Sequence, residues 1–266
     1  MKETRVMVRR ERPSALAWSI ALAVTMLAVY VLTWTAAQPG VARVSAAPRV
    51  TREIELEALK GWCVTLGAFP DAGRARMEAA GCASRGAAGG VYKSDGTWRV
   101  LGAMYATEAQ ARRVAKKLGN GNGISADVLE MEAPEVALRI TAPQPQIELI
   151  EAADEFLREQ VGQLSGFAGQ LEKGQLQPDV MRTLCALSAT EAAAMAEKLN
   201  VFPGASKDAL CGALMKRLNA LSGQLKAIAG TGQTAIPALA GMLRLSAIDD
   251  FMGMVEMRNA LLKHGN

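Results

Sequence analysis

The side chains that most often carry chemistry in proteins are sparse in this chain. Its 266 residues include one histidine, His264, the third residue from the end. That single imidazole argues against Ser-His-Asp and Cys-His catalysis and against the usual histidine metal sites. No carboxylate pair stands in an apolar setting that would tune one partner for acid–base work. We therefore expect a protein that is not an enzyme and that holds no cofactor and no metal.

Cysteine is the other residue type with chemical potential. The four cysteines are too widely spaced for a zinc motif. Two disulfide pairings are open if the residues lie outside the cytoplasm, Cys185 with Cys211 and Cys63 with Cys82. Buried free thiols are the alternative.

A stretch without Asp, Glu, Lys or Arg separates Arg12 from Arg43. Within it, residues 14–34 are rich in Ala, Leu, Val, Ile and Met, and are long enough to cross about 30 Å of hydrocarbon. Basic residues are denser before the stretch than after it, so the positive-inside rule places residues 1–13 in the cytoplasm. We expect a single-pass plasma-membrane protein with a transmembrane helix at 14–34 and its bulk outside the cytoplasm. A cleaved secretion signal is the alternative, which the length of the apolar core disfavours.

The chain after this segment changes composition twice. Residues 35–56 mix Ala, Pro, Gly and isolated charges, and predict an extended extracytoplasmic tether. Lys and Arg outnumber Asp and Glu by ten to four in residues 60–124, whereas they number twelve against seventeen in residues 125–266. This shift predicts a domain boundary near residues 120–146. The net charge of +4 and the lack of a basic run with interleaved aromatics argue against nucleic acid as a partner.

An internal repeat lies between the tether and that boundary. The segment WCVTLGAFPDAGRAR, from Trp62, aligns without a gap with WRVLGAMYATEAQAR, from Trp98, at an offset of 36 residues. Each copy predicts a strand, a turn and a helix, and Asp71 and Thr107 stand at equivalent N-cap positions. The repeat therefore indicates a duplicated unit.

The residues around the repeat complete a sheet. Asp95-Gly96 lies between two strand-like runs and is typical of a two-residue hairpin turn. A last strand is expected at about 124–131, which gives the order βαββαβ, a four-stranded antiparallel sheet with both helices on one face. Alternation directs Trp62, Val64 and Leu66 toward the helices. The residues expected on the open face are Cys63, Thr65, Arg99 and Leu101.

Residues 57–132 resemble the SPOR domain, the sporulation-related repeat, on the phrases WCVTLGAF and WRVLGAMYATEAQA. The resemblance implies a ferredoxin-like α+β fold that binds peptidoglycan glycan strands stripped of their stem peptides. It also implies a place at the division septum or in the sporulating envelope. Members commonly carry Gln where this chain has Thr65, which puts one glycan contact in doubt.

Four side chains are the candidate glycan contacts on the open face: Thr65, Tyr92, Arg99 and Leu101. Tyr92 offers a ring on which a sugar can stack. The alternatives are a solvated charge for Arg99 and a cross-strand packing partner for Tyr92.

The rest of the chain is helical in pattern. Residues 133–145 contain two prolines and predict a linker, and residues 146–264 predict a bundle of four or five helices. We expect one helix to restart at Ser188 and the final section to break at Ser246. A Phe and Met stripe at 251–261 favours core packing over a groove for an envelope protein partner.

Two functions follow from these patterns. The first is a membrane-anchored, non-catalytic protein that binds denuded glycan strands of peptidoglycan in cell division or sporulation. The second is a scaffold in which a degenerate SPOR-like domain spaces the membrane from a protein partner of the helical domain, without sugar binding.

Overall fold

The structure is a computed structural model that describes residues 48–122 and 124–264. The predicted cytoplasmic tail, the transmembrane helix at 14–34 and most of the tether lie outside the described residues. Within the described ranges, no helix has the length and apolar character needed to cross a bilayer.

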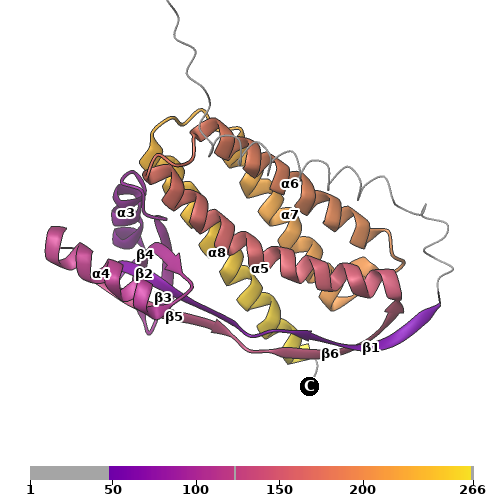
Figure 1. Ribbon diagram of the computed structural model, residues 1–266. Coiled ribbons are helices and arrows are strands. Elements are labelled where there is room, and N and C mark those ends of the chain that lie inside the picture. The colour runs from indigo at the N-terminus through magenta and orange to yellow at the C-terminus, as the bar shows by residue number, and fades with distance from the viewer. Residues whose placement is uncertain (1–47, 123, 265–266) are drawn as a thin grey trace, which may run out of the picture. The chain divides into compact units, whose positions relative to one another are not determined.

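A four-stranded antiparallel sheet forms where the repeat predicts it (Figure 1). Its strands lie in the order β3-β4-β2-β5, and α3 and α4 follow β2 and β4 along the chain. The order βαββαβ is therefore confirmed. The bounds are β2 Leu59–Phe69, α3 Ala72–Ala83, β3 Gly90–Ser94, β4 Thr97–Tyr105, α4 Glu108–Asn122 and β5 Ala126–Ala133.

The local signals of the repeat act as expected. Asp71 Oδ1 accepts a hydrogen bond from the Arg74 amide at 2.8 Å, and Thr107 Oγ1 accepts one from the Gln110 amide at 3.4 Å. Each bond satisfies an amide that the first helical turn leaves unpaired. Asp95 and Gly96 both have positive φ, 49° and 76°, as a type I′ turn between β3 and β4 requires.

The two helices cover one face of the sheet. Val64 packs against Ala111 and Ala115 of α4, with Trp62 and Leu66 beside it. This arrangement confirms the predicted direction of the three β2 side chains. A second cluster under α3 contains Ala75, Ala79, Cys82 and Val100.

A two-stranded ribbon, absent from the sequence prediction, joins β1 (Arg49–Leu56) to β6 (Val136–Pro143). The end of the expected tether and most of the expected linker are therefore strands. Ile54, Leu56 and Val136 are buried, and Arg52 Nη2 pairs with Glu151 Oε1 of the following helix at 3.2 Å. The two strands are separated by about eighty residues of chain, so no local pattern indicates their pairing.

The remaining described elements form a helical bundle, as predicted. Its helices are α5 Gln144–Glu172, α6 Pro178–Asn200, α7 Ala209–Ala229 and α8 Ile236–His264, with a short 3₁₀ turn at Ala205–Lys207. The interruptions predicted at Ser188 and Ser246 are wrong, because both residues lie inside continuous helices. Neither serine is beside a proline, and neither side chain caps the start of a helix. The buried Ser246 hydroxyl instead donates a hydrogen bond to Gln224 Oε1 at 2.9 Å.

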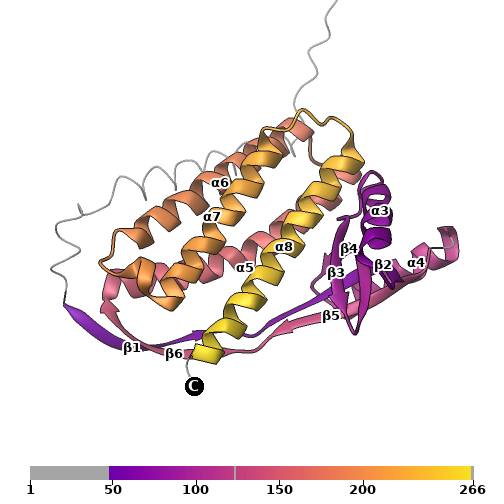
Figure 2. The same ribbon diagram turned by 180° about the vertical axis from the view of Figure 1, so that it is seen from behind.

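Helix α8 lies between the sheet and the other bundle helices (Figures 1 and 2). Gly61 of β2 and Gly90 of β3 approach it closely. A β-carbon at Gly61 would lie 3.3 Å from the Phe251 ring, and one at Gly90 would lie 3.0 Å from Leu245 Cδ1. Glycine at these two positions lets the sheet and α8 meet.

Two ion pairs with buried carboxylates hold α8 against its neighbours. Arg258 is fully buried, and its Nη2 donates to both Asp154 oxygens on α5 at 3.1 and 3.2 Å. Arg217 of α7 reaches Asp250 Oδ1 at 3.4 Å. Burial outweighs that contact and raises the pKa of Asp250 to about 7.

All four cysteines are buried and free, so neither disulfide pairing occurs and the free-thiol alternative holds. Burial raises the pKa of Cys63 and Cys185 to about 12 and that of Cys211 to about 11. A thiol held protonated in this way is a poor nucleophile.

Candidate functional site

The sheet face predicted to be open is covered. Thr65 is 1% exposed and Leu101 is 0% exposed, and Cys63 beside them is also 0% exposed. The reason is a second apolar row: Cys63, Leu101 and Met104 share the face opposite α3 and α4, and α8 covers them with Phe251. The prediction that Thr65 and Leu101 face solvent is therefore wrong.

Arg99 and Tyr92 keep contact with solvent at the rim of that face. They are direct partners across β3 and β4, and Tyr92 is 38% exposed. Arg99 Nη1 lies 3.5 Å from Asp127 Oδ2, and the Thr65 hydroxyl donates to the Asp127 carbonyl at 3.4 Å. The structure thus brings the four candidates together on one side of the sheet but exposes only two. Their role in glycan binding stays a prediction.

A larger hollow lies at the edge of the sheet and was missed from the sequence. It is a groove of about 900 Å³ between α5 and the SPOR-like domain, which contributes β2, β4 and α4. Five of its lining residues are basic, and none of the described lining residues is Asp or Glu. The basic residues are Lys60, Lys117, Arg158, Lys173 and Arg244.

Lys60 stands at one wall of this groove. Its ammonium pairs with Glu130 of β5, and this hydrogen bond raises the pKa of Lys60. The same ammonium lies 5.5 Å from the centre of the Trp62 ring. Lys60 is therefore held in place by a carboxylate and a ring that both belong to the sheet.

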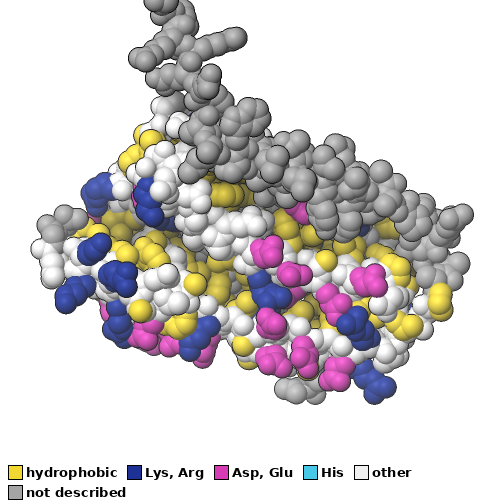
Figure 3. Space-filling model, viewed as in Figure 1, with side chains coloured by type: hydrophobic (Ala, Val, Ile, Leu, Met, Phe, Trp, Pro, Cys, Tyr) yellow, Lys and Arg dark blue, Asp and Glu magenta, His cyan; other side chains and the backbone are white. Residues whose placement is uncertain are grey.

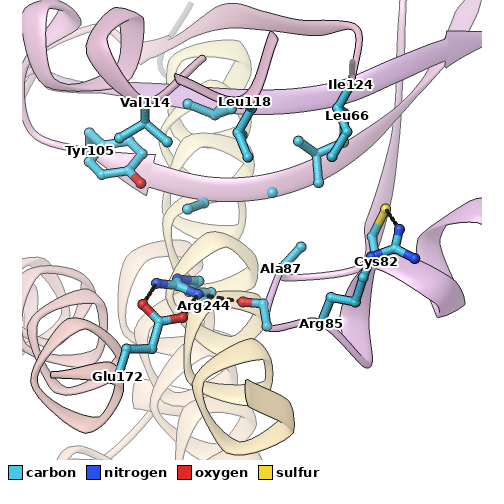
Figure 4. A pocket seen from close by; sticks show the side chains of 14 residues that line it. Leu66, Cys82, Arg85, Ala87, Tyr105, Val114, Leu118, Ile124, Glu172 and Arg244 are labelled. Atoms are coloured by element: carbon cyan, nitrogen blue, oxygen red, sulfur yellow. Dashed lines mark hydrogen bonds and ion pairs between the residues drawn. The ribbon is translucent and has the colours of Figure 1, made fainter. Parts of the chain in front are cut away.

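A smaller cavity of about 300 Å³ adjoins the groove and shares Tyr105 and Arg244 with it (Figure 4). Its apolar lining residues include Val64, Leu66, Val114 and Leu118, and its charged ones are Arg85, Glu172 and Arg244. Burial raises the pKa of the Tyr105 hydroxyl, and the nearby Arg244 offsets part of that effect.

Arg244 fixes this corner of the molecule. Its guanidinium binds Glu172 through two bonds of 2.6 Å and also donates to the carbonyl of Gly86 (Figure 4). The side chain therefore joins α8, α5 and the loop after α3 with a two-pronged geometry that lysine lacks. A sequence gives no sign of it, because the three partners are far apart along the chain.

The described residues contain no group of three or more His, Cys, Asp or Glu side chains placed to hold a metal ion. What the site offers is instead positive charge, hydroxyl and amide groups, and shape. Such an arrangement can bind an anionic or hydroxyl-rich ligand.

Comparison with known families agrees with the architecture. Residues 58–128 match the family model of the SPOR domain, a span that runs from β2 into β5. The chain therefore carries a SPOR domain, which is generally a peptidoglycan-binding module of cell division proteins. No significant match was found among curated proteins or among solved structures.

Proposed function

We propose that this chain is a membrane-anchored, non-catalytic protein of the bacterial envelope that binds peptidoglycan glycan strands during cell division or sporulation. The observation that carries the proposal is the SPOR match at residues 58–128, on a domain with the expected βαββαβ order. The uncharged stretch at 14–34 supports the anchor, and a basic groove beside the domain supports an acidic polymer as ligand.

A second candidate is favoured by one specific observation, the cover that α8 places over Thr65 and Leu101. In this alternative the SPOR domain is a structural spacer that has lost sugar binding, and the helical domain binds an envelope protein. The two candidates differ in one measurable property, affinity for the cell wall.

The test is co-sedimentation of the full chain in detergent with purified cell-wall sacculi, untreated or treated with an amidase that removes stem peptides. We expect binding that increases after amidase treatment, because the treatment enlarges the denuded glycan. A chain that stays in the supernatant with both preparations would leave the spacer as the function.

The anchor is tested separately. Membranes from cells that express the chain are washed with alkaline carbonate, and intact spheroplasts are treated with protease. Retention in the pellet and digestion of the region after residue 48 from outside are expected. Release by carbonate, or protection of that region, would contradict the proposed topology.

A further inference from the structure

Two lysines in the groove beside α5 differ from the other basic residues there. Lys60, Arg158 and Arg244 each pair with a carboxylate, of Glu130, Glu57 and Glu172 respectively. Among the residues that the structure describes, Lys117 of α4 and Lys173 at the end of α5 form no ion pair. Each leaves a full positive charge in a groove whose described lining has no acidic side chain.

Three of the α5 residues that line the groove are glycines. Gly162, Gly166 and Gly169 lie inside α5, where each costs up to about 1 kcal/mol relative to alanine. Close packing does not explain them, because a β-carbon at any of the three would meet no atom within 4 Å. Their effect is to widen the groove, whose 900 Å³ lies near the top of the range of about 300–1,000 Å³ for ligand sites.

The groove also presents neutral hydrogen-bonding groups. Gln110 of α4, Tyr105 of β4 and Ser165 of α5 all contribute to the lining. Amide and hydroxyl groups suit the hydroxyls of a sugar, whereas ammonium groups suit carboxylates. The combination describes an acidic glycan better than an apolar or purely phosphorylated ligand.

We propose that this groove, and not the sheet face under α8, binds the denuded glycan strand through the free carboxylates of its sugars. The inference rests on the proposed function. Hydrolysis of the amide that joins a stem peptide to its sugar leaves a carboxylate on the glycan and an amine on the peptide. A denuded strand therefore carries repeated negative charges. These carboxylates can pair with Lys117 and Lys173, which have no carboxylate partner among the described residues.

The first test reverses charge. The double variant Lys117→Glu/Lys173→Glu, as full chain, should bind amidase-treated sacculi on the order of tenfold more weakly or worse. Lys117→Arg/Lys173→Arg should keep most of the affinity, because the charge is retained. Wild-type affinity should also fall when the sacculus carboxylates are converted to neutral amides, and as salt is raised.

The second test fills the groove without harm to the fold. Gly166→Leu adds a side chain into open space and removes a helix-interior glycine, so the free energy of unfolding should rise slightly. Gly223→Leu is the matched control, because Gly223 is an exposed glycine of α7 outside the groove that also has nothing within 4 Å. We expect Gly166→Leu to weaken sacculus binding at least about tenfold and Gly223→Leu to leave it unchanged.

The outcomes separate this inference from the proposed function. If wild type binds and both Gly166→Leu and the Glu double variant bind equally well, the groove assignment is overturned while the function stands. If binding survives neutralisation of the carboxylates, their role is overturned. If wild type fails to bind either preparation, the proposed function and the inference fail together.

Discussion

The two faces of the four-stranded sheet differ in what covers them. One face carries Val64 and Val100 under the helices of the SPOR domain itself, and on β2 every second side chain from Trp62 to Leu66 points to it. The other carries Leu101 and Cys63, equally buried, under a helix that begins more than a hundred residues later in the chain. The first face is thus covered by segments close to it in the sequence, whereas the second face is covered by a distant segment.

The difference bears on function. A SPOR sheet with one free face has a surface for a ligand, but here α8 occupies that surface with Phe251 and Leu245. The distribution of charged side chains favours the groove, and not this face, as the ligand site. Lys and Arg side chains gather over α3 and α4, and Asp and Glu side chains over the lower half of α5 and the ribbon (Figure 3). The basic groove lies where the SPOR domain and α5 meet.

The largest expected effect on stability comes from shortening a buried side chain on the α8-covered face. Leu101→Ala should lower the free energy of unfolding by about 2–5 kcal/mol, the usual range for a fully buried leucine. Val100→Ala, on the face under α3, should cost less because it removes fewer atoms. The measurement is urea unfolding of each full-chain variant followed by circular dichroism.

The control is Leu262→Ala near the end of α8, where the side chain is 38% exposed. Its effect should stay within about 0.5 kcal/mol. A Leu101→Ala variant as stable as Leu262→Ala would mean that the second face is not part of the core, and the sheet would again be available to a ligand.

The sequence carries enough information for the local structure of the repeat. Asp71, Thr107 and the Asp95-Gly96 turn act through neighbours a few residues away, so their hydrogen bonds and φ angles follow from residue type. The direction of Trp62, Val64 and Leu66 follows from the pleat of a strand.

What the sequence could not supply is contact between distant segments. Cys63 and Thr65 flank Val64 in β2, and their side chains point to the other face of the sheet. Both are small and weakly polar, so their types suit a solvated face as well as a buried one. One signal was present: Gly61, Leu101 and Met104 make this row nearly as apolar as the first. An apolar second face indicates a cover, although not which segment supplies it.

The candidate site shows the same limit. The spacing of Lys117 and Arg112 along the sequence is that of a solvated helix face, and Arg112 does pair within α4, with Glu108. The glycines of α5 were indistinguishable from ordinary composition. Only the approach of α4 to α5 turns Lys117 and Gly166 into parts of one groove, and that approach depends on contacts such as Arg244 with Glu172.

The next prediction concerns Asp250, whose contact with Arg217 of α7 helps to hold α8 in the bundle. The pKa of Asp250 is about 7 in the folded protein, because of burial, against 3.8 for an ordinary Asp. Between these values the folded state binds a proton that the unfolded state does not. Stability contributed by this group is therefore complete below about pH 4 and is lost as pH rises to 7, with a slope of at most about 1.4 kcal/mol per pH unit.

Asp250→Asn should flatten this part of the curve, since the amide does not titrate. Urea unfolding at several values between pH 5 and 8 measures both curves. Asp179→Asn is the comparison, because Asp179 pairs with Arg182 on the surface of α6 with its side chain 95% exposed. Equal slopes for wild type and Asp250→Asn would contradict the assignment.

A smaller effect compares the two faces inside a single molecule. Gly61→Val would press against Phe251 and Met104, so α8 should leave the sheet more often. A cost of about 1 kcal/mol raises the open population roughly fivefold. The reaction of Cys63 with iodoacetamide, followed by mass spectrometry, should accelerate by about that factor. Cys82, under α3 on the other face, is the internal control and should not change.

The smallest expected effect tests the rim of the α8-covered face. Tyr92→Ala removes a ring that is 38% exposed, so the free energy of unfolding should change by less than about 1 kcal/mol. If glycan binds in the groove, the variant should also sediment with amidase-treated sacculi as wild type does. A clear loss of binding in a folded Tyr92→Ala variant would instead favour the rim that Tyr92 and Arg99 form. The glycan strand would then bind across the sheet edge beside α8, and the assignment of the ligand to the groove would be wrong.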